Sequence, residues 1–122
     1  MIGSEEVHEN LRKTFGAQAF RSGFLKLSIL RILSERPLHG YALMKEIERI
    51  TDSSWKPSPG SIYPALQSLR KNSLIDISNE GRQRTYDITP QGKAVLDYAM
   101  ERARAGLHNV QNLLEYLSLI HI

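Results

Sequence analysis

One segment, residues 55–71, constrains the fold more than any other, because prolines interrupt a stretch that otherwise has the apolar spacing of a helix. Its three prolines are Pro57, Pro59 and Pro64. The first two hold the chain extended, since the residue before a proline is pushed out of the helical region. The third must lie close to a helix start, where a missing N–H group has no helical partner to lose. We therefore predict a loop that becomes a helix near Gly60 or Ser61, with a hydroxyl cap from Ser58 or Ser61.

The predicted helix has two unlike faces. Its apolar residues recur at three- and four-residue steps and form the inner face: Ile62, Ala65, Leu66 and Leu69. The outer face is small, polar and cationic, without a carboxylate, and consists of Gly60, Pro64, Gln67 and Lys71, flanked by Ser61, Tyr63 and Ser68. Such a face can approach a polyanion closely, because glutamine can bond a base edge while serine, tyrosine and lysine can bond phosphate oxygens. An ordinary solvated face has a similar composition, so the neighbouring segments must decide.

Helices are also predicted before this segment. A buried helix is expected over residues 24–35, because its apolar residues cover most of the circumference. Another is expected over residues 41–50, separated by a polar turn from the segment at 55–71. Two helices across a short connection, the second with a polar and cationic outer face, match a helix-turn-helix arrangement in outline. A shorter helix is expected over residues 5–20, with Gly23 separating it from the buried helix.

A β-hairpin is predicted to follow. Asn72 is expected in the left-handed position that ends the helix, and residues 74–78 and 85–88 have the alternation and β-branching of strands. Arg82 and Arg84 lie at the tip and on the returning strand. These arginines could reach a phosphate backbone or a narrow minor groove. Equally, they could be a solubilising cluster that keeps an exposed strand edge from pairing.

A helix of unusual length is predicted at the C-terminal end. Thr89 and Pro90 are an N-cap followed by proline at the first helical position, and the helix should continue to about Leu117. At 1.5 Å per residue it would be about 40 Å long, more than a domain this small can cover. A second copy is therefore expected on its apolar stripe, in a two-fold homodimer. The stripe comprises Leu96, Ala99, Ala103, Leu107, Val110, Leu114 and Leu117. In the alternative, the helix at 5–20 folds back over the stripe in a monomer.

Composition excludes several classes of function. The 122 residues suit one domain, and 41% hydrophobic with 24% charged residues is typical of a soluble globular protein. There is no cysteine, and no two of the four histidines lie three or four residues apart, so no metal site is expected. The sequence has neither a nucleophile motif nor a glycine-rich phosphate loop, so no cofactor and no enzymatic activity are expected. No apolar run could span a membrane and no signal-peptide pattern is present, so a cytoplasmic location is expected. The net charge of +3 permits a nucleic-acid partner without requiring one.

Three motifs, in this order, resemble the PadR family of transcriptional regulators. They are Leu38-His39-Gly40-Tyr41, Ser58-Pro59-Gly60-Ser61-Ile62-Tyr63-Pro64-Ala65-Leu66 and Thr89-Pro90-Gln91-Gly92-Lys93. The resemblance covers about residues 24–93. It implies a mainly α fold with a small β-hairpin wing, a winged helix-turn-helix with a long C-terminal dimerisation helix. Residues 1–22 would contribute to the dimer, residues 23–89 would bind DNA, and residues 90–122 would form the dimerisation helix.

The resemblance further implies a homodimeric repressor of palindromic operator DNA, released by a small apolar or aromatic effector. Together with the residue patterns, it gives a set of expected DNA contacts: Tyr41, Lys56, Ser58, Gly60, Ser61, Tyr63, Pro64, Gln67, Lys71, Arg82 and Arg84. The backbone at Gly40 would also meet phosphate. The alternative function is a winged-helix module that binds another protein. That function needs an exposed apolar patch, where this recognition face offers small, polar and cationic residues.

Overall fold

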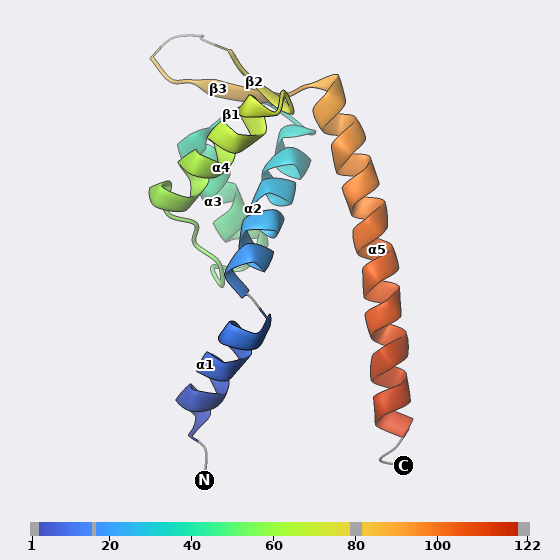
Figure 1. Ribbon diagram of the computed structural model, residues 1–122. Coiled ribbons are helices and arrows are strands. Elements are labelled where there is room, and N and C mark those ends of the chain that lie inside the picture. The colour runs from blue at the N-terminus through green and yellow to red at the C-terminus, as the bar shows by residue number, and fades with distance from the viewer. Residues whose placement is uncertain (1–2, 16, 79–81, 120–122) are drawn as a thin grey trace.

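The computed structural model describes residues 3–15, 17–78 and 82–119, which form helices and one small antiparallel sheet. The helices are α1 (Ser4–Phe15), α2 (Ala17–Leu33), α3 (Gly40–Ile50), α4 (Pro59–Lys71) and α5 (Pro90–Leu119). The strands are β1 (Leu38–His39), β2 (Ile75–Ser78) and β3 (Thr85–Ile88). Helices α2, α3 and α4 pack together beside the sheet, while α1 and most of α5 extend away from this body in the same general direction (Figure 1). The mainly α fold with a small β wing is confirmed.

The core lies where α2 meets the helix-turn-helix and the sheet. Among the residues whose burial is described, seven large side chains are fully buried, and they come from α2, α3, α4 and β2: Ile29, Leu33, Leu43, Ile47, Ile62, Leu66 and Ile75. Burial of one such side chain contributes about 1.5–3 kcal/mol. All four residues predicted for the inner face of α4 are buried. The 3.6-residue period therefore fixes which face of α4 is left for solvent or a partner.

The two N-terminal helices divide at a different place from the one predicted. Helix α1 ends at Phe15 and α2 begins at Ala17, so Gly23 lies inside α2 and separates nothing. A Cβ at Gly23 would meet no atom within 4 Å, which places this glycine on an open side of the helix. An internal glycine costs only about 0.5–1 kcal/mol, and the burial of Leu25 and Ile29 on the other side outweighs it.

The sequence patterns do not predict strand β1, which lies in the short connection between the helices expected at 24–35 and 41–50. The sheet order is β1-β3-β2, with Leu38 opposite Tyr86 and His39 opposite Thr85. A strand of two residues is too short to show the alternation that marks strands in a sequence. Because β1 leads directly into α3, it joins the start of the helix-turn-helix to the wing strand β3.

The start of α4 agrees with the predicted region but not with the predicted cap. The helix begins at Pro59 with Ser58 as N-cap in an extended conformation, and no side chain caps it. The Ser58 hydroxyl instead donates to the Ser61 hydroxyl at 3.3 Å. Pro64 lies inside the helix, where its missing N–H leaves the Gly60 carbonyl without its usual helical donor.

The end of α4 corrects the role of Asn72. Its φ is −90°, whereas Ser73 has φ 62° and takes the left-handed position. Leu74 N–H donates to the Leu69 carbonyl and Ser73 N–H to the Arg70 carbonyl, both at 3.0 Å. These two bonds form a Schellman motif with serine where glycine is usual.

Helix α5 starts where the sequence predicts. The Thr89 hydroxyl accepts a hydrogen bond from Gly92 N–H at 2.9 Å, so Thr89 caps the helix, and it donates to the Ser73 carbonyl at 2.7 Å. A Cβ at Gly92 would lie 2.1 Å from the Leu74 carbonyl oxygen. The end of α4 and the start of α5 are therefore in direct contact, and this contact fixes the direction in which α5 leaves the body. None of the described helices is both long and apolar enough to cross a membrane.

Candidate nucleic-acid interface

The eleven residues expected to contact DNA are all exposed. They come from three parts of the fold: the first turn of α3, the loop and outer face of α4, and the wing. Residues 55–71 contain no carboxylate, while Lys56, Arg70 and Lys71 supply positive charge. The sequence therefore places a cationic helix face opposite a buried apolar face, as the predicted interface requires.

The loop before α4 alternates between packed and exposed side chains. Trp55 packs against the core and Pro57 is buried. Lys56, which lies between them, and Ser58, which follows Pro57, are exposed. The packed residues therefore hold this loop against the core, while the Lys56 ammonium and the Ser58 hydroxyl remain accessible to a partner. From Gly60 to Lys71 the outer face of α4 extends for about 16 Å, and a helix with its side chains fits the major groove of B-DNA.

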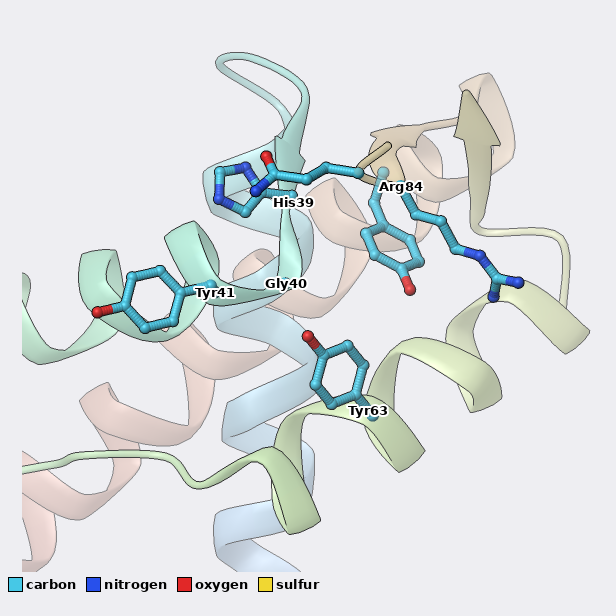
Figure 2. A pocket seen from close by; sticks show the side chains of 7 residues that line it. His39, Gly40, Tyr41, Tyr63 and Arg84 are labelled. Carbon is cyan, nitrogen blue, oxygen red and sulfur yellow. The ribbon is translucent and has the colours of Figure 1, made fainter. Parts of the chain in front are cut away.

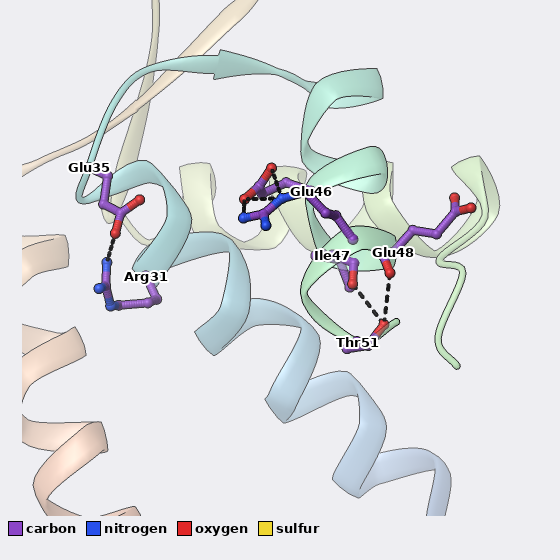
Figure 3. Close-up of polar contacts among 7 residues, drawn as sticks. Arg31, Glu35, Glu46, Ile47, Glu48 and Thr51 are labelled. Carbon is purple, nitrogen blue, oxygen red and sulfur yellow. Dashed lines mark hydrogen bonds and ion pairs between the residues drawn. The ribbon is translucent and has the colours of Figure 1, made fainter. Parts of the chain in front are cut away.

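The turn between α3 and α4 is held by Thr51. Its hydroxyl donates to the Ile47 carbonyl at 2.8 Å and accepts from Trp55 N–H at 3.3 Å. Asp52 and Ser53, with φ 50° and 62°, then reverse the chain in left-handed conformations. Figure 3 shows Thr51 closing onto the last turn of α3. These contacts set the geometry between the two helices of the helix-turn-helix.

Charged residues near the end of α2 and on α3 are paired with one another. Arg31 bonds Glu35 at 2.9 Å, and the Arg49 guanidinium bonds Glu46 (Figure 3). The hydrogen bond from Arg49 holds the pKa of the Glu46 carboxyl below its usual value, although burial opposes this. The same hydrogen bond with Glu46 raises the pKa of Arg49. These carboxylates are therefore balanced locally.

A hollow lies between the start of α3, helix α4 and the wing. Its lining residues are His39, Gly40, Tyr41, Tyr63, Gln83, Arg84 and Tyr86. In Figure 2 the Tyr63 phenol points from α4 toward the start of α3, and the Arg84 guanidinium points from the wing toward α4. A Cβ at Gly40 would lie 2.9 Å from both Cε1 and Oη of Tyr63. The missing side chain at Gly40 therefore lets the Tyr63 ring lie against α3.

Three residues beside the interface were not among the expected contacts. His39 and Gln83 line the hollow, and Lys45 lies over the Tyr41 ring with Nζ 5.5 Å from the ring centre. Lys45 could have been found from the sequence, because it is four residues after Tyr41 and so shares its helix face. His39 and Gln83 are brought together only by the pairing of β1 with β3, which the sequence did not reveal.

The apolar stripe of α5 is divided between two environments. Leu96 is 4% exposed in the core of this chain, and Ala99 is half-buried. Leu96 is therefore not available to a second copy, contrary to expectation. The remaining five stripe residues are exposed: Ala103, Leu107, Val110, Leu114 and Leu117. Leu113 and Tyr116 are exposed beside them. Because this stripe is bare, the alternative in which the N-terminal helix covers it in a monomer is wrong.

No group of three or more metal-ligating side chains occurs among residues 3–15, 17–78 and 82–119. The residues that converge at the candidate interface are aromatic, amide, hydroxyl and cationic side chains. Their chemistry is suited to binding an anion, and it includes no nucleophile paired with a base.

Comparison with known proteins identifies the same family as the three motifs. A family model described as "Transcriptional regulator PadR-like family" matches residues 29–98. The transcriptional regulator YqjI of Escherichia coli is 44% identical over 84 residues, which are 68% of this chain and 41% of that protein. The chain thus spans about two fifths of the length of that relative.

Two further relatives are covered more fully. The transcriptional regulator Rv3488 of Mycobacterium tuberculosis is 32% identical over 81 residues, with 63% of this chain and 73% of that protein covered. The crystal structure of a PadR-like transcriptional regulator from Bacillus cereus has a TM-score of 0.68 and 29% identity, and it covers 75% of this chain and 92% of that one.

Proposed function

This chain belongs to the PadR-like family of transcriptional regulators, and from that premise we propose that it represses transcription by binding palindromic operator DNA as a homodimer. The observation that carries the proposal is the outer face of α4, which is exposed, free of carboxylates over its whole length and positively charged in its last turn. Regulators of this family are not enzymes, in keeping with the absence of a catalytic motif in the sequence.

The contacts divide into those that position the protein and those that select a sequence. Gln67 and Ser61 project from the groove-facing side of α4, where they can bond base edges. Lys56, Lys71, Tyr63 and the other exposed donors of the loop, α3 and the wing can bond phosphates, which gives affinity without sequence preference.

Dimerisation would bring two recognition helices to one face of the duplex. The exposed stripe from Ala103 to Leu117 is the surface for the second copy, because an apolar helix seam of this length is stable only when covered. Two recognition helices in successive major grooves lie about 34 Å apart, so half-sites should be about ten base pairs apart.

A small apolar or aromatic effector could release the repressor. Such a ligand would shift the equilibrium only if it binds one arrangement of the dimer more tightly than the other. Movement of the two α5 helices along their seam would change the separation of the recognition helices. The DNA-bound role also favours a cytoplasmic location.

The first experiment is binding to DNA from upstream of the chain's own gene, compared with a shuffled fragment of equal length across a salt series. The proposal predicts tighter binding to the native fragment at physiological salt, with two chains per site. Equal, strongly salt-dependent binding to both fragments would reduce the function to phosphate attraction. Absence of binding at every salt concentration would contradict the proposal and favour a protein partner instead.

A further inference from the structure

The hollow between α3, α4 and the wing has the chemistry of an anion site. Of the residues that the structure describes, Arg84 is the one formally charged residue that lines it, no carboxylate does so, and the other polar groups are hydroxyls, an amide and an imidazole. Every one of these groups can donate a hydrogen bond. An anion with several acceptor oxygens is the partner that such a lining fits.

The donors of the hollow are unused in the free protein. Among the described residues, the Tyr63 hydroxyl, the Arg84 guanidinium and the side chains of His39 and Gln83 have no hydrogen bond or ion pair. This contrasts with Arg31 and Arg49, which are both paired with carboxylates. Unpaired donors from separate elements that face one hollow are available to a ligand without breaking an existing contact.

The position of the Tyr63 hydroxyl is fixed by its neighbour. The ring lies against Gly40, where a Cβ would come within 2.9 Å of the phenol oxygen. In Figure 2 the hydroxyl points toward the start of α3 at Gly40, while the Arg84 guanidinium points from the wing toward α4. The recognition helix and the wing therefore each contribute a donor to the lining of the same hollow.

We propose that this hollow seats a single phosphodiester group of the duplex, held jointly by Tyr63 from α4, Arg84 from the wing and His39 from β1. The inference rests on the proposed DNA binding and adds to it a specific site and a further contact, His39. Gripping one phosphate from both sides fixes the wing relative to the recognition helix, so the register of α4 in the groove is set by a shared contact. Gln83 lies in the same lining and can supply a fourth donor.

The test is a scan in which each phosphate of a binding site selected from random DNA is replaced in turn by a neutral methylphosphonate. Binding is measured for the unsubstituted protein and for Tyr63→Phe, Arg84→Gln and His39→Ala. Tyr63→Phe removes only the hydroxyl and keeps the ring over Gly40. Arg82→Gln is the matched control, because Arg82 is an exposed arginine of the same wing that does not line the hollow.

Each of the three variants is expected to weaken binding to normal DNA by about tenfold. One methylphosphonate position should weaken binding by the unsubstituted protein by a similar factor. On DNA with that modification, each of the three variants should bind as tightly as the unsubstituted protein, because the contact is already lost. On the same modified DNA, Arg82→Gln should still weaken binding by its full factor. Arg84→Gln should also lower the slope of log affinity against log salt by about one.

Two results would overturn the shared seat while leaving DNA binding intact. In the first, the methylphosphonate position that removes the effect of Tyr63→Phe differs from the position that removes the effect of Arg84→Gln. In the second, no methylphosphonate position removes the effect of Arg84→Gln, which would mean that Arg84 does not hold a phosphate of the duplex. Failure of the unsubstituted protein to bind any selected DNA would instead overturn the proposed function, and the seat with it.

Discussion

The outer face of α4 carries side chains that can read a base and side chains that can only hold the backbone. Gln67 has both a donor and an acceptor and can bond an adenine edge at two points. Tyr63 has one hydroxyl, lies against Gly40 and is 47% exposed at the edge of the wing hollow. The two residues are one helical turn apart on the same element, so their substitution separates the two kinds of contact.

We predict that Gln67→Ala relaxes sequence preference, because a bidentate base contact contributes about 1–3 kcal/mol of discrimination. Tyr63→Ala should weaken binding to specific and random DNA alike, by about tenfold. Both variants are to be titrated against a selected operator and a shuffled duplex. Equal losses on the two duplexes for Gln67→Ala would show that Gln67 does not read a base.

Replacing either of two helical glycines with alanine should change the folding stability in opposite directions. Gly92→Ala would place a methyl group 2.1 Å from the Leu74 carbonyl oxygen, and overpacking of this kind costs about 1–3 kcal/mol of folding stability. Gly23→Ala adds a methyl group in open space and should stabilise α2 by about 0.5–1 kcal/mol. Urea unfolding measures both changes, and destabilisation by Gly23→Ala comparable with that of Gly92→Ala would contradict the packing described here.

Ser73 is strained where α4 ends. It holds a left-handed φ of 62° that glycine adopts without a Cβ clash. We predict that Ser73→Gly stabilises the protein by about 0.5–1 kcal/mol, since the Schellman bonds use only backbone atoms. A rise in the urea midpoint tests this, and a fall would mean that the serine side chain contributes more than its strain removes.

At the scale of elements, α4 and α5 are readable from sequence because their signals are local. Prolines locate the start of α4, Thr89 caps α5, and the apolar period gives the inner face of each. Strand β1 and the start of α2 depend on tertiary packing: two residues have no period, and the glycine at 23 is outweighed by the leucines and isoleucines around it. The periodicity also fails at Leu96, because it tells which side of a helix is apolar but not whether the same chain or a second copy covers it.

For the candidate interface, the outer face of α4 could be predicted from the sequence and the hollow could not. The exposed residues on the outer face of α4 follow from one helical period, because they lie opposite its apolar face. The hollow could not be predicted, because it forms where three segments far apart in the sequence meet: residues 39–41, Tyr63 and residues 83–86. Only the pairing of β1 with β3 brings His39 beside the wing.

For the whole molecule, the exposed half of α5 is the surface on which the proposed dimer depends. Leu107, Val110, Leu114 and Leu117 are 45–59% exposed along one stripe of a single chain. Apolar side chains in such a row lose contact with water only when another surface packs on them. In the proposed dimer, the packing of the two chains and the spacing of their α4 helices would therefore be linked through α5.

We predict that Leu114→Glu converts a dimer into a monomer, because a buried carboxylate without a partner is strongly unfavourable in an apolar seam. Light scattering should give twice 13.9 kDa for the unsubstituted chain and 13.9 kDa for the variant. The matched control is Asn112→Glu, which adds the same charge to an exposed polar position of α5. Loss of the dimer in both variants would point to general charge repulsion.

Affinity as a function of half-site spacing tests whether two α4 helices enter successive major grooves. A selected palindromic operator is compared with versions that carry five or ten extra base pairs between its half-sites. Two recognition helices on a two-fold dimer predict tight binding with the half-site centres about ten base pairs apart. Five added base pairs should abolish cooperative binding, because they place one half-site on the opposite side of the duplex. Equal affinity at every spacing would contradict the claim that two α4 helices enter successive major grooves.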